Sequence, residues 1–296
     1  MDTPMSKNTL SDVFVKDAMR RIIISLPQNI SIDSSINTLI KHKISGILTL
    51  DDSGKPSGVV SKTDIIGAYY ATLPIDSPLE YIMASPPLVC SMDDPLEAAL
   101  EKMRESSVYR LYVTGNDGTI VGSLAYPDIV GLLYRSCYEC NYSHFRNSNE
   151  GDVETIKRLN VKDVVALECK TVSPTDTLFT VMEEISTYRI GAILVTDDNN
   201  FPVGVISKTD LILAYKHGIE QESEASLIMT SPVQTCNADD LLETAVRKMI
   251  FTDIHRLFVR NEEDGDINGV FSLADAARCR SGSCHACISS RITIDH

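Results

Sequence analysis

The chain has 296 residues, of which 43% are hydrophobic and 23% charged, and it carries a formal net charge of −14. This is the composition of a soluble globular protein with room for two domains, and aliphatic runs such as residues 22–24 are far shorter than the roughly 20 residues of a membrane span. The acidic balance disfavours nucleic acid but permits a small anionic ligand, and the N-terminal sequence, which lacks a secretory signal, predicts a cytoplasmic location.

The first predicted unit follows a short N-terminal tail and ends in the phrase GVVSKTDIIGAY at residues 58–69. The phrase returns as GVISKTDLILAY at residues 204–215, with nine of twelve letters identical, so the chain repeats itself at a separation of 146 positions. The helix of the first unit, between Ile36 and Gly46, is expected to be about three residues shorter than its counterparts, roughly one turn.

Two further pairs of segments have the same separation. PLEYIMASPP at 78–87 returns as EASLIMTSP at 224–232, and VYRLYV at 108–113 returns as IHRLFV at 254–259. Each of four units also ends in a glycine followed six positions later by an aspartate: Gly58 and Asp64, Gly122 and Asp128, Gly204 and Asp210, Gly269 and Asp275. A fixed distance in four copies indicates an internal repeat.

The third unit shows the element order most clearly. Residues 174–176 predict a turn and a helix start, and apolar residues at helical spacing follow them. Residues 191–195 and 201–206 predict two short strands joined by the turn DDNN at 197–200. A second helix is predicted to begin at residues 209–210, so the order is strand, helix, strand, strand, helix.

The Met-Ala/Thr-Ser-Pro openings, the HRLFV run and the Gly–apolar–apolar–Ser–x–x–Asp endings strongly resemble the cystathionine β-synthase (CBS) domain family. The resemblance implies an α/β (α+β) fold of four CBS repeats that form two Bateman modules, at about 11–137 and 161–282, packed as a disc. The predicted organisation is an N-terminal tail at 1–10, CBS 1 at 11–70, CBS 2 at 79–137, a linker with a CxxC pair at 138–160, CBS 3 at 161–218, CBS 4 at 225–282, and a C-terminal tail with a CxxC pair at 283–296.

In members of this family that bind adenosine nucleotides, the repeat aspartate holds the ribose and the preceding Ser or Thr meets the phosphate. The chemistry fits, because a carboxylate can accept two hydrogen bonds from a cis-diol and a helix start offers N–H groups to an anion. The resemblance therefore implies ribose contacts by Asp64, Asp128, Asp210 and Asp275, and phosphate contacts by Ser61, Ser207 and Ser272. Further nucleotide-binding candidates in the same turns are Lys62, Thr63, Lys208 and Thr209.

A structural role competes with ligand binding at each of these turns. Ser-x-x-Asp at a helix start also caps the exposed N–H groups, which stabilises a helix by about 1 kcal/mol. The identical Ser-Lys-Thr-Asp sequence around Asp64 and Asp210 favours ligand binding there. Unit two has Ala125 where the hydroxyl is expected, followed by Tyr126 and Pro127, so capping alone is favoured for Asp128.

Arg110 and Arg256 stand at equivalent positions, and His255 precedes the second. The γ subunits of AMP-activated protein kinase, which the chain resembles, carry His-Arg at this point in CBS units two and four, where the pair grips phosphates in a shared central cavity. Arginine suits that role through its fixed fork of donors. The resemblance therefore makes all three residues phosphate-binding candidates, with a solvated surface charge as the alternative.

Eight cysteines in a chain without an export signal are expected to be reduced thiols. Cys90, Cys169 and Cys236 stand among apolar residues and are predicted to be small core groups. The two CxxC pairs, Cys137 with Cys140 and Cys284 with Cys287, follow the aspartates of units two and four at the same distance. Two such pairs suit zinc or an iron–sulfur cluster, provided that the ends of units two and four meet. Spare candidate ligands are Cys279 and His285.

The leading hypothesis is a non-catalytic regulatory sensor, such as an energy sensor, that binds AMP, ADP, ATP or S-adenosylmethionine in clefts between CBS repeats and signals to a protein partner. It is expected to be a monomer with a self-contained disc or a homodimer. An enzyme is disfavoured, because few residues lie outside the repeats and no nucleophile–base pair or P-loop is present. The alternative is a thiol- or metal-responsive regulatory or scaffold protein that uses the CxxC pairs.

Overall fold

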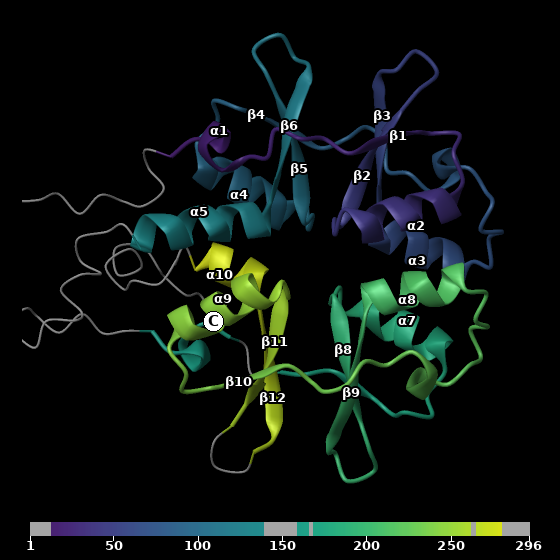
Figure 1. Ribbon diagram of the computed structural model, residues 1–296, viewed down its shortest axis with the longest axis vertical. Coiled ribbons are helices and arrows are strands. Elements are labelled where there is room, and N and C mark those ends of the chain that lie inside the picture. Colours follow the sequence, from purple (N-terminus) through teal and green to yellow (C-terminus); the bar gives the residue numbers. More distant parts are fainter. Residues whose placement is uncertain (1–12, 139–158, 166–167, 262–264, 280–296) are drawn as a thin grey trace, which may run out of the picture. The chain divides into compact units, whose positions relative to one another are not determined.

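A computed structural model describes residues 13–138, 159–165, 168–261 and 265–279 (Figure 1). The secondary-structure elements follow the same order in each of the four repeats. Repeat one contains β1 (Ser25–Pro27), α2 (Ile32–Lys41), β2 (Gly46–Leu50), β3 (Pro56–Ser61) and α3 (Lys62–Tyr70). Repeat two contains β4 (Val89–Ser91), α4 (Leu96–Glu105), β5 (Arg110–Thr114), β6 (Ile120–Ala125) and α5 (Tyr126–Tyr138).

Repeat three contains β7 (Thr171–Val172), α7 (Leu178–Thr187), β8 (Ala192–Thr196), β9 (Pro202–Ser207) and α8 (Lys208–Lys216). Repeat four contains β10 (Thr235–Asn237), α9 (Leu242–Thr252), β11 (Arg256–Arg260), β12 (Ile267–Ser272) and α10 (Leu273–Arg278). Short helices outside this pattern are α1 (Val15–Ala18), η1 (Leu79–Tyr81), η3 (Val161–Asp163) and η4 (Ala225–Leu227). The α/β fold class and the strand-helix-strand-strand-helix repeat are confirmed.

Each repeat builds one three-stranded sheet. Its first strand pairs in parallel with the second, and the second pairs antiparallel with the third, as in β1-β2-β3 and β4-β5-β6. The parallel pair needs a crossover connection, which the first helix of the repeat provides. The antiparallel pair is joined by a short turn, and the second helix begins directly after the third strand. Every repeat therefore presents one strand-to-helix turn of the same construction.

The expectation of a shortened helix in repeat one is wrong. Helix α2 has 10 residues, as do α4 and α7. It begins at Ile32, because the Ser31 hydroxyl accepts a hydrogen bond from the backbone N–H of Ser34 at 3.3 Å and caps the helix start. Helix α2 therefore has a first turn before Ile36, and the Ser31 cap marks its start. Among the described helices, none is long and apolar enough to cross a lipid bilayer.

The chain divides into two compact units, each of which combines alternate repeats. We call residues 23–88 and 169–233 the one–three unit, and residues 1–22, 89–168 and 234–296 the two–four unit. In the one–three unit, α3 packs against α8 (Figure 1). The rings of Tyr69 and Tyr215 stack there with centroids 5.0 Å apart, and the apolar faces of both repeats form one buried core.

In the two–four unit, α5 packs against α10, and the repeats again share one core. Cys90 and Cys236 are buried in this core, which agrees with the prediction that they are small core groups. Cys169, the third thiol of that prediction, is only half-buried. Each unit thus takes one repeat from each half of the sequence.

The glycine that begins the ending of repeats one, two and three has a packing role. A short extended segment crosses the third strand beside it, with Ala84 bridged to Val59 in repeat one and Thr230 bridged to Val205 in repeat three. A Cβ atom added to Gly58 would lie 2.7 Å from the carbonyl oxygen of Ala84, which is closer than real contacts allow. The fixed distance from glycine to aspartate therefore places a close backbone crossing a few residues before the start of a helix.

Candidate nucleotide-binding turns and basic centre

The Ser-x-x-Asp turns are capping boxes in repeats one, three and four. In repeat one, Oδ2 of Asp64 accepts hydrogen bonds from the backbone N–H and the hydroxyl of Ser61, both at 2.7 Å. The Asp210 turn has the same two bonds at 2.7 and 2.5 Å, and the Asp275 turn has them at 2.9 and 2.6 Å. Capping, the competing role considered from the sequence, is therefore present at these turns.

Capping uses only one carboxylate oxygen at each of these three turns. Within the described part of the chain, no hydrogen bond reaches Oδ1 of Asp64, Asp210 or Asp275. A carboxylate that keeps one acceptor oxygen can still take hydrogen bonds from a diol. A single side chain can thus cap its helix and hold a ligand, and the two roles are compatible.

Repeat two differs. Oδ2 of Asp128 accepts only the backbone N–H of Ala125, at 2.9 Å, because alanine has no hydroxyl. Its Oδ1 forms an ion pair with Nε of Arg20 at 2.5 Å, and the Asp128 side chain is only 4% exposed. Both oxygens of this carboxylate therefore have partners inside the protein. Arg20 has no distinguishing local pattern, and sequence analysis did not single it out.

The lysines of the two Ser-Lys-Thr-Asp turns meet in the one–three unit. Nζ of Lys62 donates to the hydroxyl of Thr209 at 2.8 Å, and Nζ of Lys208 donates to the hydroxyl of Thr63 at 2.8 Å. The exchange is reciprocal and lies at the N-terminal ends of α3 and α8. The structure thereby brings together all four lysine and threonine candidates from these turns, with two cations beside two helix starts.

Both arginine candidates lie in the two–four unit. Arg110 opens β5 and Arg256 opens β11, each opposite the residue that ends the third strand of its repeat. Arg110 donates to the hydroxyl of Ser123 at 2.7 Å through one terminal nitrogen, whereas its buried Nε has no hydrogen-bond partner among the described residues. Tyr109 precedes Arg110 in the sequence and His255 precedes Arg256. The rings of Tyr109 and His255 stack with centroids 6.0 Å apart.

Burial makes this basic centre unusual. Burial lowers the pKa of Arg256, although Tyr109 and Asp275 favour its charged form. Burial also raises the pKa of Tyr109. Tyr109 and Tyr126 pack edge to face at 5.2 Å, and within the described residues the hydroxyls of both are buried without a hydrogen-bond partner. Buried donors of this kind carry a desolvation cost that an anionic ligand would offset. The two tyrosines were not among the candidates from the sequence.

The cysteine candidates for metal binding lie outside the described residues, apart from the backbone of Cys137 at the end of α5. The same holds for His285. Among the residues that are described, no group of three or more His, Cys, Asp or Glu side chains could hold a metal ion. Cys279 is half-buried, and burial beside Asp275 raises its pKa to about 12. Repeats two and four belong to one compact unit, and a shared metal site at their ends stays a prediction.

Comparison with known proteins identifies the family. The sequence model of the CBS domain matches residues 15–71, 79–135, 161–217 and 224–282. The chain therefore belongs to the CBS domain family. The crystal structure of the MJ1225 protein of Methanocaldococcus jannaschii superposes with a TM-score of 0.74 at 16% identity, covering 90% of this chain and 99% of that one. At this identity the likeness concerns the fold.

Sequence relatives are distant. MJ1225 is 22% identical over 198 residues, which are 67% of this chain and 68% of that protein. The AMP-activated protein kinase subunit gamma of Saccharomyces cerevisiae is 26% identical over 194 residues, 61% of this chain and 56% of the yeast protein. Homoserine O-acetyltransferase of Methanohalobium evestigatum is 29% identical over 126 residues, which are 43% of this chain but only 25% of that enzyme. The match to the enzyme thus concerns a minor part of its length.

Proposed function

We propose that the protein is a non-catalytic regulatory sensor that binds an adenosine-containing ligand on its Ser-x-x-Asp turns. AMP, ADP, ATP and S-adenosylmethionine are the candidate ligands, and an unidentified protein partner would respond to the bound state. The observation that carries the proposal is the second carboxylate oxygen of the capping aspartates, which accepts no hydrogen bond from any described residue. In repeats one and three this oxygen belongs to Asp64 and Asp210, whose turns share the same four residues.

The proposal assigns the phosphates of a nucleotide to cationic side chains. In the two–four unit, which has its own Asp275 turn, these side chains are Arg110 and the buried Arg256. Nε of Arg110 has no hydrogen-bond partner among the described residues, and His255 stacks on the neighbouring Tyr109. The one–three unit supplies Lys62 and Lys208 at helix starts, where the helix dipole also favours an anion. These local cations can attract a phosphate although the net charge of the chain is −14.

Titration calorimetry of AMP against carboxylate variants tests the proposal. The double variant Asp64→Asn/Asp210→Asn keeps one oxygen on each side chain for the cap but replaces the other acceptor by an amide. We expect it to bind AMP more than tenfold more weakly, since a hydrogen bond to a charged group contributes about 1.5–3 kcal/mol. Undiminished affinity in a folded double variant would remove these residues from the site.

A capping control separates binding from stability. Ser31→Ala/Thr177→Ala removes the capping hydroxyls of α2 and α7 in the same unit but leaves both Ser-Lys-Thr-Asp turns intact, so it should lower the free energy of unfolding by about 1 kcal/mol per helix. Its effect on AMP affinity should be smaller than that of the carboxylate variant. If both variants lose affinity in proportion to their stability, the turns act through the fold and not through direct contact with the ligand.

A thiol- or metal-responsive role remains the second candidate. Its support is the pairing of repeats two and four in one unit, together with the equal spacing of the CxxC pairs after Asp128 and Asp275. Elemental analysis of untagged protein should find zinc or iron near one equivalent per two CxxC pairs, and Cys284→Ser/Cys287→Ser should remove it. Less than about 0.1 metal per chain, with freely titratable thiols, would exclude the shared site.

A further inference from the structure

The ion pair between Arg20 and Asp128 distinguishes repeat two from repeats one and three, whose aspartates have no ion pair among the described residues. Asp128 holds the position at which a ribose would be bound, yet its second oxygen already accepts a hydrogen bond from the Arg20 guanidinium at 2.5 Å. The aspartate side chain is 4% exposed, whereas that of Arg20 is 62% exposed. The guanidinium therefore reaches in from the surface and covers a nearly buried carboxylate.

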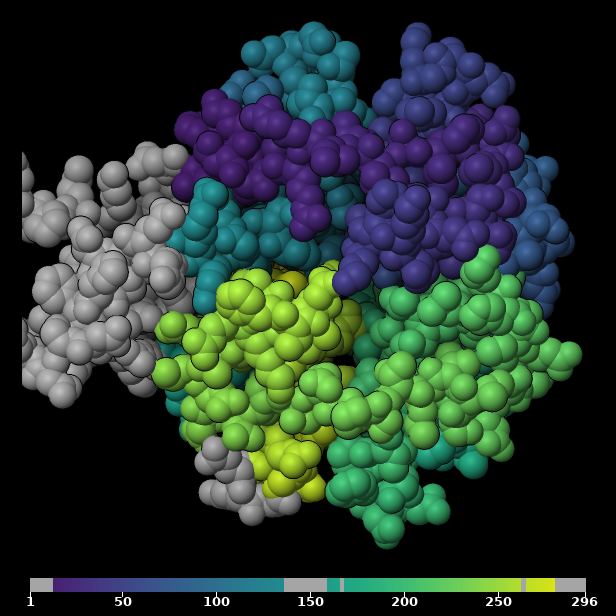
Figure 2. All heavy atoms as spheres, viewed as in Figure 1, coloured from purple at the N-terminus to yellow at the C-terminus, as the bar shows by residue number. Residues whose placement is uncertain are grey.

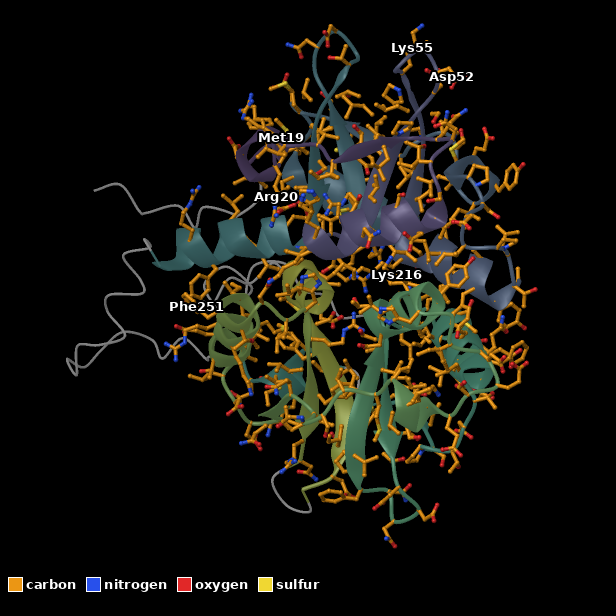
Figure 3. The ribbon with its side chains drawn as sticks, turned by 45° about the vertical axis from the view of Figure 1, so that its right-hand side comes forward. Met19, Arg20, Asp52, Lys55, Lys216 and Phe251 are labelled. Atoms are coloured by element: carbon orange, nitrogen blue, oxygen red, sulfur yellow. The ribbon has the colours of Figure 1, made fainter. Side chains whose placement is uncertain are left out.

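The backbone holds Arg20 in place for this contact. Its N–H donates to the carbonyl oxygen of Ser123 and its carbonyl accepts the N–H of Ser123, both at 2.9 Å. A Cβ atom added to the neighbouring Gly122 would lie 2.6 Å from the Arg20 carbonyl oxygen, so the segment crosses the strand at the closest possible approach. Figure 2 shows this N-terminal segment, in purple, lying on repeat two, and Figure 3 labels Met19 and Arg20 in it.

The equivalent crossing positions of repeats one and three, which the structure describes, carry no cation. Ala84 makes the same bridge to repeat one, and Thr230 makes it to repeat three. Alanine has no polar side chain, and the Thr230 hydroxyl donates to the carbonyl oxygen of Val205 at 3.2 Å. Oδ1 of Asp64 and of Asp210 therefore accepts no hydrogen bond from the crossing segment, whereas Oδ1 of Asp128 accepts one from Arg20. The difference between these aspartates follows from the residue at the crossing position, which is Arg20 in repeat two.

We propose that Arg20 is a specificity-determining residue that takes the place of a ribose at Asp128, so repeat two does not bind the adenosine ligand. This inference rests on the proposed function. A guanidinium N–H bonded to a carboxylate is roughly twice as strong as a hydrogen bond between neutral groups. A neutral ribose diol cannot displace a tethered cation that is already in place. The missing hydroxyl at Ala125 removes a second ligand contact from the same turn.

Counting bound AMP tests the inference. Arg20→Met keeps the length of the side chain but removes the cation, and we expect it to bind one more AMP per chain than the parent does in titration calorimetry. The double variant Arg20→Met/Asp128→Ala should lose this gain. Ala84→Arg introduces a guanidinium at the exposed equivalent position in repeat one, and it should bind one AMP fewer. Circular dichroism confirms that each variant is folded at the temperature of titration.

A matched control lies in the same segment. Lys16 forms a surface ion pair with Asp93 at 2.8 Å, so Lys16→Met removes a nearby cation without touching a repeat aspartate. Its AMP count should equal that of the parent. An equal count in Arg20→Met would overturn the inference while the proposed function stands, and an unchanged count in Ala84→Arg would overturn it as well.

The two proposals fail in different ways. If the parent binds no AMP but Arg20→Met binds one, the proposed sites in repeats one and three are wrong and the role of Arg20 is supported. If neither the parent nor any variant binds AMP, both proposals are wrong. If the parent binds AMP and Arg20→Met gains a site that depends on Asp128, both are supported.

Discussion

Lys62 and Thr209 are 147 positions apart in the sequence, yet Nζ of the lysine donates to the threonine hydroxyl at 2.8 Å. Lys208 and Thr63 repeat the contact in the opposite direction. The two turns that look most alike in the sequence are therefore direct neighbours in the one–three unit. A phosphate bound at one turn would also lie near the lysine of the other, so the two turns form one electrostatic site.

Replacing these lysines tests that coupling. Lys62→Met/Lys208→Met should weaken the binding of ATP more than that of adenosine, and the difference should shrink in high salt, because screening weakens charge attraction. The control is Lys216→Met, which removes an ion pair with Asp33 at the other end of α8. It should leave the ratio of the two affinities unchanged. Calorimetry at two salt concentrations measures both, and equal losses for ATP and adenosine would place the lysines outside the phosphate site.

Arg256→Met should separate ligand binding from stability. Burial disfavours the charge of Arg256, as its lowered pKa indicates, and within the described residues no hydrogen bond compensates it. A buried charge without a hydrogen-bonded partner carries a desolvation cost that an apolar side chain of similar length does not have. We therefore expect an unchanged or higher midpoint of thermal unfolding without ligand, and a smaller increase of that midpoint with ATP.

The comparison variant for this prediction is Arg247→Met, which removes an exposed arginine from α9. It should change neither the unfolding midpoint nor its response to ATP. A marked loss of stability in Arg256→Met, together with a normal response to ATP, would show that this arginine serves the fold alone.

The core thiols should be unreactive in the folded protein. Burial raises the pKa of Cys90 to about 11 and that of Cys236 to about 12, with Asp94 and Asp240 adding to the effect. Fewer than about one in a thousand of these groups would be thiolate at neutral pH. Iodoacetamide should therefore leave both unmodified in native protein and alkylate both in guanidinium chloride, as peptide mass spectrometry can measure. Fast native alkylation of either would contradict its place in the core.

The repeat architecture could be predicted from the sequence because its signals are local. The glycine, the aspartate six positions later and the alternation of strand and helix patterns all lie within short stretches of sequence and recur four times, and the serine of the Ser-x-x-Asp ending recurs three times. Helix α2 shows the limit of such patterns, since its start depends on the Ser31 cap and not on the first apolar residue.

Long-range pairing could not be predicted in the same way. An apolar face on α3 shows that the helix is covered, but not that α8 covers it. The contact of Arg20 with Asp128 spans 108 positions and involves a common surface residue type. The buried hydroxyls of Tyr109 and Tyr126 likewise follow from packing in three dimensions. The sequence therefore identified most candidate residues, whereas their partners required the structure.

The glycines of the repeat offer a last test, which concerns the fold alone. Gly58→Ala places a methyl group 2.7 Å from the backbone oxygen of Ala84, and the crossing segment is fixed there by two hydrogen bonds between Val59 and Ala84, each 2.9 Å long. Since neither backbone can move without loss of that bridge, the variant should lower the free energy of unfolding by about 1–3 kcal/mol. Gly67→Ala is the matched control, because its Cβ would meet nothing within 4 Å and alanine favours the helix by about 1 kcal/mol. Urea unfolding should therefore move in opposite directions for the two variants, and a Gly58→Ala protein as stable as the parent would refute the packing role of the repeat glycine.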